Sequence, residues 1–512
     1  MCDRLSWMCP ALLSLLLPGY RARTMPCGLP YKSPLIPLSP ASIISSSTPM
    51  ILCRMETRRS CSPLLAVACL LLCALFPSIA AISAGSPDGS IQWGYVETRA
   101  GINMFWLWYR SPQRISTPAR PWPTVLWLQG GPGGSGVGHG NFLEIGPLDV
   151  NLKPRQWTWL KVADLIFVDA PVGVGYSYAE DPSDLVKTDS QAVMDLAVVL
   201  EELLKNELPS LKHSPLYIVG ESYGGKLAAM LGVSVSRAIR AGTLKLTLGG
   251  VVLGDSWISP ADFSLSYAQL LHYVSRLKDN AVADVNKMAV MVKEQMLAGQ
   301  YATARQTFTD QLDLIDSQSD SVNINNFLLD TGMNPVLTDG NLKTNSSLLR
   351  TTQKSESAPN NTIDGDMNGP IKKMFKIIPK GLIWQDASID VYDALVNDFM
   401  KPAIDQVDEL LSRGVNVTVY QGQLDVICST IGAEAWVGKL KWSGLRHFLS
   451  LRRQPLHFCD SAIYCSEAIK AYVRSYKNFE FYWILEAGHM LPVDQPYVAF
   501  RMIASITQSP GI

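Results

Sequence analysis

A serine at position 222 lies in the run Gly-Glu-Ser-Tyr-Gly of residues 220–224, directly after the apolar stretch 216–219. A serine hydroxyl is a weak nucleophile unless a base, itself oriented by a third group, removes its proton. Gly-x-Ser-x-Gly between a strand and a helix is typical of the nucleophile elbow, a sharp turn in which glycines leave room for the crowded backbone. Residues 226–239 have helical character, so we predict that Ser222 is a nucleophile.

An acid and then a histidine are expected to follow such a serine along the chain. Four histidines come after Ser222, at positions 272, 447, 457 and 489. Asp425 and His489 each lie just past an expected strand, 415–420 and 479–485, where open α/β sheets place their sites. The other three histidines lie in helical or basic stretches without a preceding strand. The sequence therefore predicts Ser222, Asp425 and His489 as a catalytic triad.

A glycine-rich loop, Trp127-Leu128-Gln129-Gly130-Gly131-Pro132-Gly133-Gly134, follows an earlier expected strand. Its backbone N–H groups can face a developing oxyanion; the alternative is a plain flexible turn. The glycine spacing also matches a dinucleotide fingerprint, but a proline lies inside the turn and no strand with a terminal acid follows about 20 residues on. Phosphate-loop, His-Glu-x-x-His and paired Cys-x-x-Cys motifs do not occur in the sequence, so we expect no metal and no cofactor.

Two glutamates are candidates for anion binding: Glu144, in Phe-Leu-Glu-Ile-Gly-Pro of residues 142–147, and Glu221, next to the serine. Two adjacent carboxyl groups cannot both ionise cheaply, so one of them keeps its proton and can bind an anion through a hydrogen bond. The alternative is that Glu144 caps a helix or faces solvent.

The elements that position these residues are read from apolar runs bounded by Gly and Pro. Strands are expected at 104–109, 124–128, 165–168, 216–219, 248–253, 415–420 and 479–485, with a helix at 190–204. Continuous apolar strands alternating with helices predict an α/β fold whose mostly parallel sheet is covered on both faces.

The alternation stops between about residues 260 and 387. Residues 262–304 are helix-rich, and residues 309–368 are polar. A polar stretch of this length inside a domain is typical of a lid, an excised linker or disorder. We interpret 260–387 as a helical cap inserted into the α/β domain and ending in an exposed loop; a plain surface insertion is an equal alternative.

The N-terminal part is predicted to be a targeting segment. Met55 precedes Arg58-Arg59, an apolar run at 63–76 and small residues at 78–84, which together describe a secretory signal peptide. We assign 1–54 to an atypical extension, 55–83 to the signal peptide and 84–512 to the hydrolase domain. A targeting tail or a signal-anchor starting at Met1 is the alternative.

Composition narrows the function classes. The net charge of the 512-residue chain is -1 and charged residues make up 17%, so no basic stripe indicates nucleic acid. Seven of the ten cysteines lie before residue 84, and the local candidate for a disulfide is Cys459–Cys465. Sequons at Asn345, Asn360 and Asn416 become glycosylation candidates behind a signal peptide.

The elbow, the glycine-rich loop, the run 169–178 and Gly-His-Met-Leu-Pro at 488–492 together resemble the serine carboxypeptidase family, α/β-hydrolases that remove C-terminal amino acids. The resemblance extends from about residue 92 to the C-terminus. Gln129 stands where most members have asparagine, Gly134 where most have cysteine, and both, with the run 254–260, favour one branch of the family.

The resemblance implies that Ser222 attacks the scissile carbonyl, His489 takes and returns the proton, and Asp425 orients the histidine. The N–H groups of Gly131 and Tyr223 would form the oxyanion hole. The residues expected to bind substrate, mostly at its terminal carboxylate, are Gln129, Gly130, Glu144, Glu221 and Met490. A carboxylate held by a protonated glutamate implies an acidic working pH. Cys428 is expected to be a buried free thiol near the site.

The partner expected from this resemblance is a peptide with a free C-terminal carboxylate, with no nucleic acid and no stable membrane span after signal cleavage. The expected location is the secretory pathway, either secreted or in the lysosome or vacuole. Three alternatives stay open: an acyltransferase using the same triad, a non-catalytic binding or stabilising partner, and, for the assembly, a homodimer.

Overall fold

The centre of the fold is a run of parallel strands. The computed structural model describes residues 81–115, 117, 119–331, 363–458 and 468–511. In order across the sheet, the parallel strands are β5 (Asp164–Val168), β4 (Thr124–Leu128), β7 (Pro215–Glu221), β8 (Thr247–Gly254), β9 (Val417–Gly422) and β12 (Phe479–Ile484). Each overlaps a strand expected from the sequence, although β9 begins two residues after the expected start, and most of their side chains are buried, as strands covered on both faces require.

Antiparallel strands extend the sheet at both edges. They are β1 (Ala81–Gly85), β2 (Ile91–Arg99) and β3 (Ile102–Tyr109) beside β5, with β6 (Tyr178–Ala179) on β3, and β11 (Ala471–Tyr476) and β10 (Gln454–Leu456) beyond β12. The sheet is therefore mixed with a mostly parallel centre. The predicted domain boundary at residue 83 falls inside β1, whose pairing with β2 begins at Ala81. The earlier residues, with the predicted signal peptide up to residue 80, lie outside the described part.

The two faces of the sheet bury separate apolar clusters. Along β4, Leu126 and Leu128 belong to one cluster, whereas Val125 and Trp127 belong to the other. This alternation is what a strand with both faces covered must show. The principal helices of the first face are α3 (Asp189–Glu202), α4 (Tyr223–Arg240), α11 (Ile404–Ser412) and α12 (Thr430–Val437); α15 (Pro496–Ile506) packs on the second.

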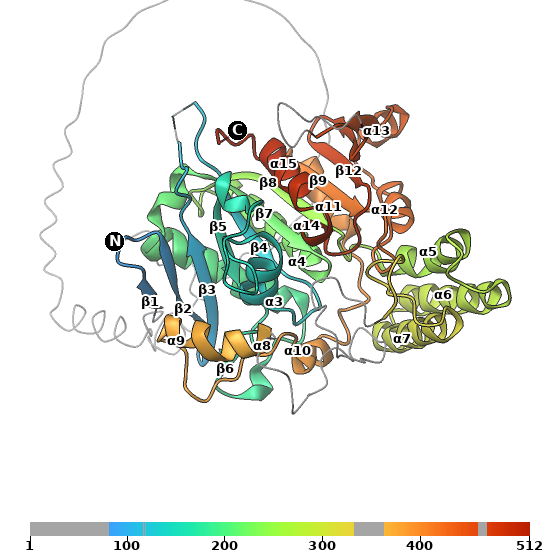
Figure 1. The fold of residues 1–512 in the computed structure, drawn as a ribbon, viewed down its shortest axis with the longest axis horizontal. Coiled ribbons are helices and arrows are strands. Elements are labelled where there is room, and N and C mark those ends of the chain that lie inside the picture. Colours follow the sequence, from blue (N-terminus) through green and yellow to red (C-terminus); the bar gives the residue numbers. More distant parts are fainter. Residues whose placement is uncertain (1–80, 116, 118, 332–362, 459–467, 512) are drawn as a thin grey trace, which may run out of the picture. The chain divides into compact units, whose positions relative to one another are not determined.

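The expected cap contains three long helices, α5 (Pro260–Tyr273), α6 (Val282–Leu297) and α7 (Tyr301–Gln318), which lie side by side in Figure 1. One expectation is corrected here: residues 309–318 complete α7 and are not loop. Leu312 and Ile315 are buried together with Phe308, so this apolar stripe outweighs the polar composition. Residues 332–362 lie outside the described part. Shorter helices follow: α8 (Ile363–Asp366), α9 (Lys372–Phe375), α10 (Ile389–Ala394), α13 (Leu445–Ser450) and α14 (Leu491–Asp494).

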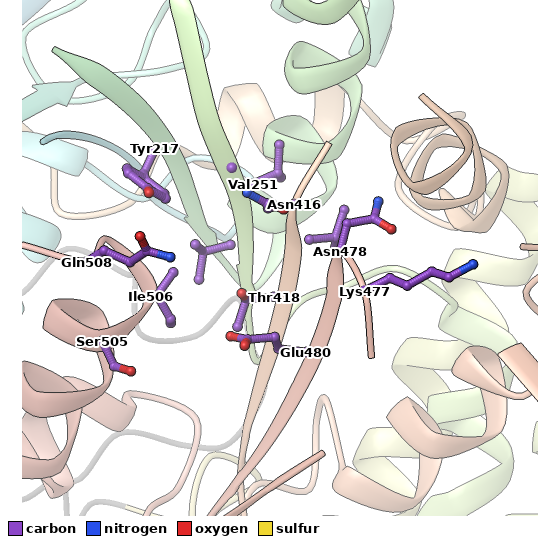
Figure 2. A pocket seen from close by; sticks show the side chains of 13 residues that line it. Tyr217, Val251, Asn416, Thr418, Lys477, Asn478, Glu480, Ser505, Ile506 and Gln508 are labelled. Atoms are coloured by element: carbon purple, nitrogen blue, oxygen red, sulfur yellow. The ribbon is translucent and has the colours of Figure 1, made fainter. Parts of the chain in front are cut away.

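A pocket lies at the starting ends of β8, β9 and β12 (Figure 2). Its lining includes Thr418, Lys477 and Glu480. The residues predicted for catalysis follow the opposite, carboxyl ends of the strands, so this pocket is not where we look for chemistry. Within the described residues, none of the helices is long and apolar enough to cross a bilayer.

Candidate active site

Ser222 occupies a strained turn between β7 and α4. Its backbone has φ 56° and ψ -126°, a conformation that non-glycine residues rarely adopt. A Cβ atom on Gly220 would lie 2.2 Å from the carbonyl oxygen of Gly224, and one on Gly224 would lie 2.1 Å from that of Leu128. The two glycines are therefore required, and the elbow predicted from the sequence is present.

The glycine-rich loop after β4 passes directly over this serine. A Cβ atom on Gly130 would lie 2.5 Å from Cβ of Ser222 and 3.0 Å from its Oγ. The next residue, Gly131, has φ 113° and follows this close approach. Tyr223 is the first residue of α4, so its N–H has no acceptor within the helix. The N–H groups of Gly131 and Tyr223 therefore belong to the two chain segments next to Ser222, where an oxyanion hole would form.

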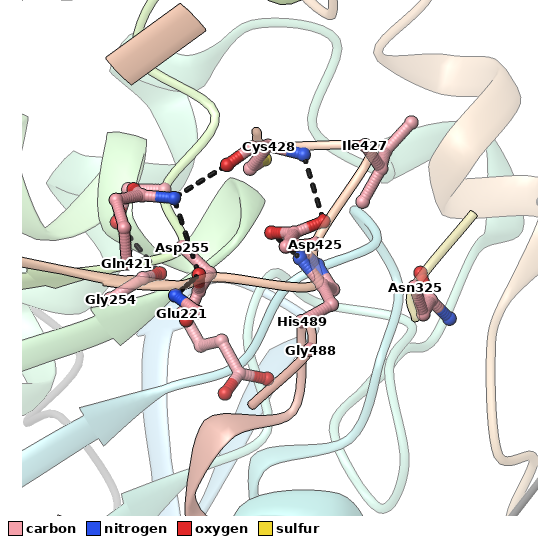
Figure 3. A network of polar contacts seen from close by, with 12 residues as sticks. Glu221, Gly254, Asp255, Asn325, Gln421, Asp425, Ile427, Cys428, Gly488 and His489 are labelled. Carbon is pink, nitrogen blue, oxygen red and sulfur yellow. Dashed lines mark hydrogen bonds and ion pairs between the residues drawn. The ribbon is translucent and has the colours of Figure 1, made fainter. Parts of the chain in front are cut away.

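His489 and Asp425 are hydrogen-bonded to each other (Figure 3). Nδ1 of His489 lies 2.8 Å from Oδ2 of Asp425, which is fully buried and also accepts at Oδ1 from the Cys428 N–H at 3.1 Å. Because a carboxylate only accepts, Nδ1 carries the hydrogen and Nε2 is left as the basic nitrogen. Ser222, Asp425 and His489 follow β7, β9 and β12. Because these strands are parallel, their carboxyl ends lie at the same end of the sheet, called this edge of the sheet below, and bring the three residues there.

The two predicted glutamates are both buried. Glu144 and Glu221 are each 1% exposed, and among the described residues outside the pair none donates a hydrogen bond to either oxygen of Glu144 or to Oε2 of Glu221. Gln129 joins the group: its Oε1 accepts from Nε1 of Trp127 at 2.7 Å and its Nε2 donates to Oε1 of Glu221 at 3.1 Å. This burial excludes the alternative in which Glu144 faces solvent.

Burial and proximity change the acidity of this pair. Burial raises the pKa of Glu144, although hydrogen bonding with Glu221 and the charge of His139 oppose the rise. Burial, followed by the neighbouring Glu144 carboxyl, raises the pKa of Glu221 well above its usual value. The pair therefore holds a proton to higher pH than a free carboxyl group does.

Asp169 fixes the segment that carries Glu144. Glu144 belongs to the helical segment η1 (Gly136–Ile145), which Ser135 caps through its side chain. Asp169 accepts from Oγ of Ser135 at 2.6 Å, from the Val137 N–H at 3.0 Å and from the Tyr176 N–H at 2.8 Å. Burial raises the pKa of Asp169 to about 6. The run 169–178 therefore acts on the site through η1.

A buried ion pair behind the elbow was missed by the sequence reasoning. Nζ of Lys226 lies 2.7 Å from Oδ2 of Asp189, and Oδ1 of Asp189 accepts from the hydroxyl of Tyr223. Lys226 is 1% exposed. The signal that existed was a cation among small and apolar residues in the first turns of the helix that follows the serine.

A second missed residue is Asp255, which lies two residues past the expected strand 248–253 and directly follows β8. It is fully buried and accepts from the Gly422 N–H at 2.7 Å and from Nε2 of Gln421 at 3.2 Å. Its position after β8, between β7 and β9, places it at the same sheet edge as the predicted triad. That position was the available signal.

The remaining predicted residues have these placements. Met490 is partly buried beside His489 in the chain, and Cys428 is a buried free thiol whose pKa burial raises well above its usual value. Sγ of Cys428 and ligand atoms of Asp425 and His489 lie within 4.8 Å of one another, but the aspartate and histidine are already bonded to each other. Asn416 is exposed. Asn345, Asn360, Cys459 and Cys465 lie outside the described residues.

The fold and this edge of the sheet define the chain as an α/β-hydrolase. The family model "Serine carboxypeptidase" matches residues 83–509. The chain belongs to the serine carboxypeptidase family, and its enzyme class is that of a serine-type carboxypeptidase.

Similar proteins agree with this assignment. The chain is 53% identical over 438 residues to serine carboxypeptidase-like 51 of Arabidopsis thaliana, covering 83% of this chain and 94% of the relative. It is 41% identical over 441 residues to the retinoid-inducible serine carboxypeptidase of Homo sapiens, covering 85% and 96%. A prohormone-processing carboxypeptidase from Saccharomyces cerevisiae has a similar fold, with a TM-score of 0.66 at 20% identity over 82% of this chain and 91% of that structure.

Proposed function

We propose that this protein releases C-terminal amino acids from peptides through an acyl-enzyme formed on Ser222. In this reaction His489 removes the serine proton and returns it to the leaving amine, while Asp425 holds the imidazole in the required tautomer. The N–H groups of Gly131 and Tyr223 bind the oxyanion. The observation that carries the proposal is the His489–Asp425 hydrogen bond at 2.8 Å, at the carboxyl end of the sheet, where Ser222 directly follows β7.

Specificity for the chain terminus is assigned to the buried glutamate pair. A carboxylate that enters the site needs a hydrogen donor, and a glutamic acid that keeps its proton supplies one. Gln129 orients Glu221, and Gly130 and Met490 line the approach. Because the pair must hold a proton, peptide binding is strongest at acidic pH and weakens as the pair ionises.

The test is hydrolysis of blocked dipeptides such as benzyloxycarbonyl-Phe-Leu, with Ser222→Ala as the control. Release of the free C-terminal amino acid by the wild type and not by the variant is the expected result. A folded wild type that releases no amino acid at any pH would contradict the proposal. Products with a competing amine or alcohol separate hydrolysis from acyl transfer, because a transferase forms mainly the transfer product.

The proposal includes passage through the secretory pathway. It is supported by the apolar run 63–76 after Arg58-Arg59 and by the exposed sequon at Asn416. N-terminal sequencing of the protein made in eukaryotic cells, together with digestion by an N-glycosidase, tests it. An unprocessed, unglycosylated chain would contradict this part of the proposal.

A further inference from the structure

Asp255 is a buried carboxyl group with one unused oxygen. It follows β8 at φ 39° and is 0% exposed. Its Oδ1 accepts two hydrogen bonds, from the Gly422 N–H at 2.7 Å and from Nε2 of Gln421 at 3.2 Å. Its Oδ2 has no partner within the described residues. A carboxylate oxygen that is buried and unpartnered costs free energy, whereas a protonated oxygen beside an acceptor does not.

The carboxyl group that Asp255 contacts is that of Asp425, which can act as an acceptor. Both residues are bonded to the end of β9. Gly422 donates its N–H to the Asp255 carboxyl group, and its carbonyl oxygen accepts from the backbone N–H of Asp425 at 3.4 Å. Gln421 also donates to the Cys428 carbonyl, while the Cys428 N–H donates to Asp425. Figure 3 shows that Gln421 and Cys428 are hydrogen-bonded to each other, that Gln421 is also bonded to Asp255, and that Cys428 is also bonded to Asp425.

The charges around Asp255 are mostly negative. The titratable groups that face it are Asp425 after β9, Glu221 at the end of β7 and Asp494 on α14. His489 lies beyond Asp425, and the neutral groups are Cys428 and Tyr420. Burial, and then the charge of Asp425, raise the pKa of Asp255 well above its usual value. The oxygens of Asp425 already accept from His489 and Cys428, so the proton belongs on Asp255.

We propose that Asp255 is a positioning residue that stays protonated in the working enzyme and donates a hydrogen bond from Oδ2 to the Asp425 carboxylate. The bond withdraws negative charge from Asp425, so His489 holds a proton less tightly. A histidine surrounded by ionised carboxylates would remain an imidazolium at acidic pH and could not act as a base. Asp255 thereby keeps His489 available as a base in the pH range where the glutamate pair binds substrate.

The inference rests on the proposed roles of Asp425 and His489, and its test avoids the glutamate pair. We would measure the second-order rate of Ser222 labelling by a fluorophosphonate from about pH 4 to about pH 9, since this reagent carries no carboxylate. The acid limb of that profile reports ionisation of His489. Wild-type protein that is folded and never labelled would overturn the proposed function and this inference together; normal labelling leaves the Asp255 variants to decide the inference alone.

Two substitutions of Asp255 are expected to change the pH profile differently. Asp255→Asn supplies an amide that donates to Asp425 and accepts from Gly422, so the acid limb keeps its midpoint. Asp255→Ala removes the donor, so the midpoint moves to higher pH by about one unit, a tenfold slower reaction at a fixed acidic pH. If Asp255 is ionised instead, Asp255→Asn removes a negative charge and moves the acid limb to lower pH, which would overturn the inference.

A control and a second readout guard against a merely structural effect. Asp195→Asn alters another buried carboxyl, whose partners Arg99 and Thr98 lie on β2, and is expected to leave the profile in place. If Asp255→Ala does not fold, proton NMR of the His489 Nδ1 hydrogen in wild type and Asp255→Asn still decides. Equal titration midpoints support the inference, and a lower midpoint in Asp255→Asn overturns it.

Discussion

Gly134 leaves the space that Gln129 occupies: a Cβ atom at Gly134 would lie 3.2 Å from Cγ of Gln129 and 3.0 Å from the Gly130 carbonyl oxygen. Because a side chain at position 134 would press on Gln129, the long amide and the missing side chain belong together. With this space, Gln129 extends between Trp127 and Glu221 and holds the carboxyl that we assign to substrate binding.

The first prediction concerns this pair. Gly134→Ala should raise KM for peptide acids about fivefold or more, because overpacking costs about 1–3 kcal/mol and displaces Gln129 from Glu221. Adding Gln129→Asn withdraws one methylene and should recover part of the loss. A double-mutant cycle on KM measures the coupling; purely additive effects would show that the two positions are independent.

The second prediction concerns how KM depends on pH. The pKa of Glu221 is raised by burial and by Glu144, so the protonated pair is lost as pH rises and KM should rise with it. Glu221→Gln keeps a hydrogen donor that cannot ionise, so it should flatten the pH dependence of KM, whereas Glu221→Ala removes the donor and should raise KM at acidic pH about 10- to 100-fold, the worth of a hydrogen bond to a charged group. The measurement is steady-state kinetics, with Glu202→Gln, at a buried glutamate on α3, as the control. A pH dependence of KM that is the same in Glu221→Gln and Glu202→Gln would refute the assignment.

The third prediction concerns stability against pH. Because Glu144 and Glu221 have raised pKa values in the folded state, the native protein binds more protons than the unfolded chain above about pH 4.5, the ordinary glutamate value. The free energy of unfolding should therefore fall as pH rises from there through the native pKa values. The Glu144→Gln/Glu221→Gln variant should show a shallower fall in chemical denaturation. An unchanged slope would place the protons elsewhere.

The fourth prediction concerns the ion pair beneath the elbow. Lys226→Met leaves the Asp189 carboxylate buried without its cation and should cost about 3–5 kcal/mol of unfolding free energy. Adding Asp189→Asn should recover part of this loss. Lys205→Met, which breaks an exposed pair with Glu201, should cost below about 1 kcal/mol. Equal effects of the two lysine variants in denaturation curves would contradict a buried structural role.

The sequence predicted most of the parallel centre of the fold, because buried strands such as 124–128 and 216–219 are continuous apolar runs between Gly and Pro. It did not predict the edge strands β1, β10 and β11, whose faces are partly exposed and whose pattern is mixed. Residues 309–318 were misjudged because their buried stripe is sparse, and only packing against the other cap helices reveals it.

The site divides in the same way. Ser222 and His489 lie in motifs with a fixed relation to a strand end, so type and spacing were enough. Lys226 and Asp255 are residue types that composition assigns to the surface, and their burial depends on partners far away in the sequence, Asp189 and the end of β9. A contact of that kind is visible only when the fold has brought the strand ends together.

We infer that a serine acyl-enzyme and a protonated carboxyl pair together select the chain terminus. The most direct test compares kcat/KM for a blocked dipeptide acid and its C-terminal amide from about pH 4 to about pH 8, in wild type and Ser222→Ala. We predict that the acid is the better substrate at low pH, that its advantage declines as pH rises, and that the variant cleaves neither. Equal cleavage of acid and amide at every pH, or activity that survives in Ser222→Ala, would contradict the account.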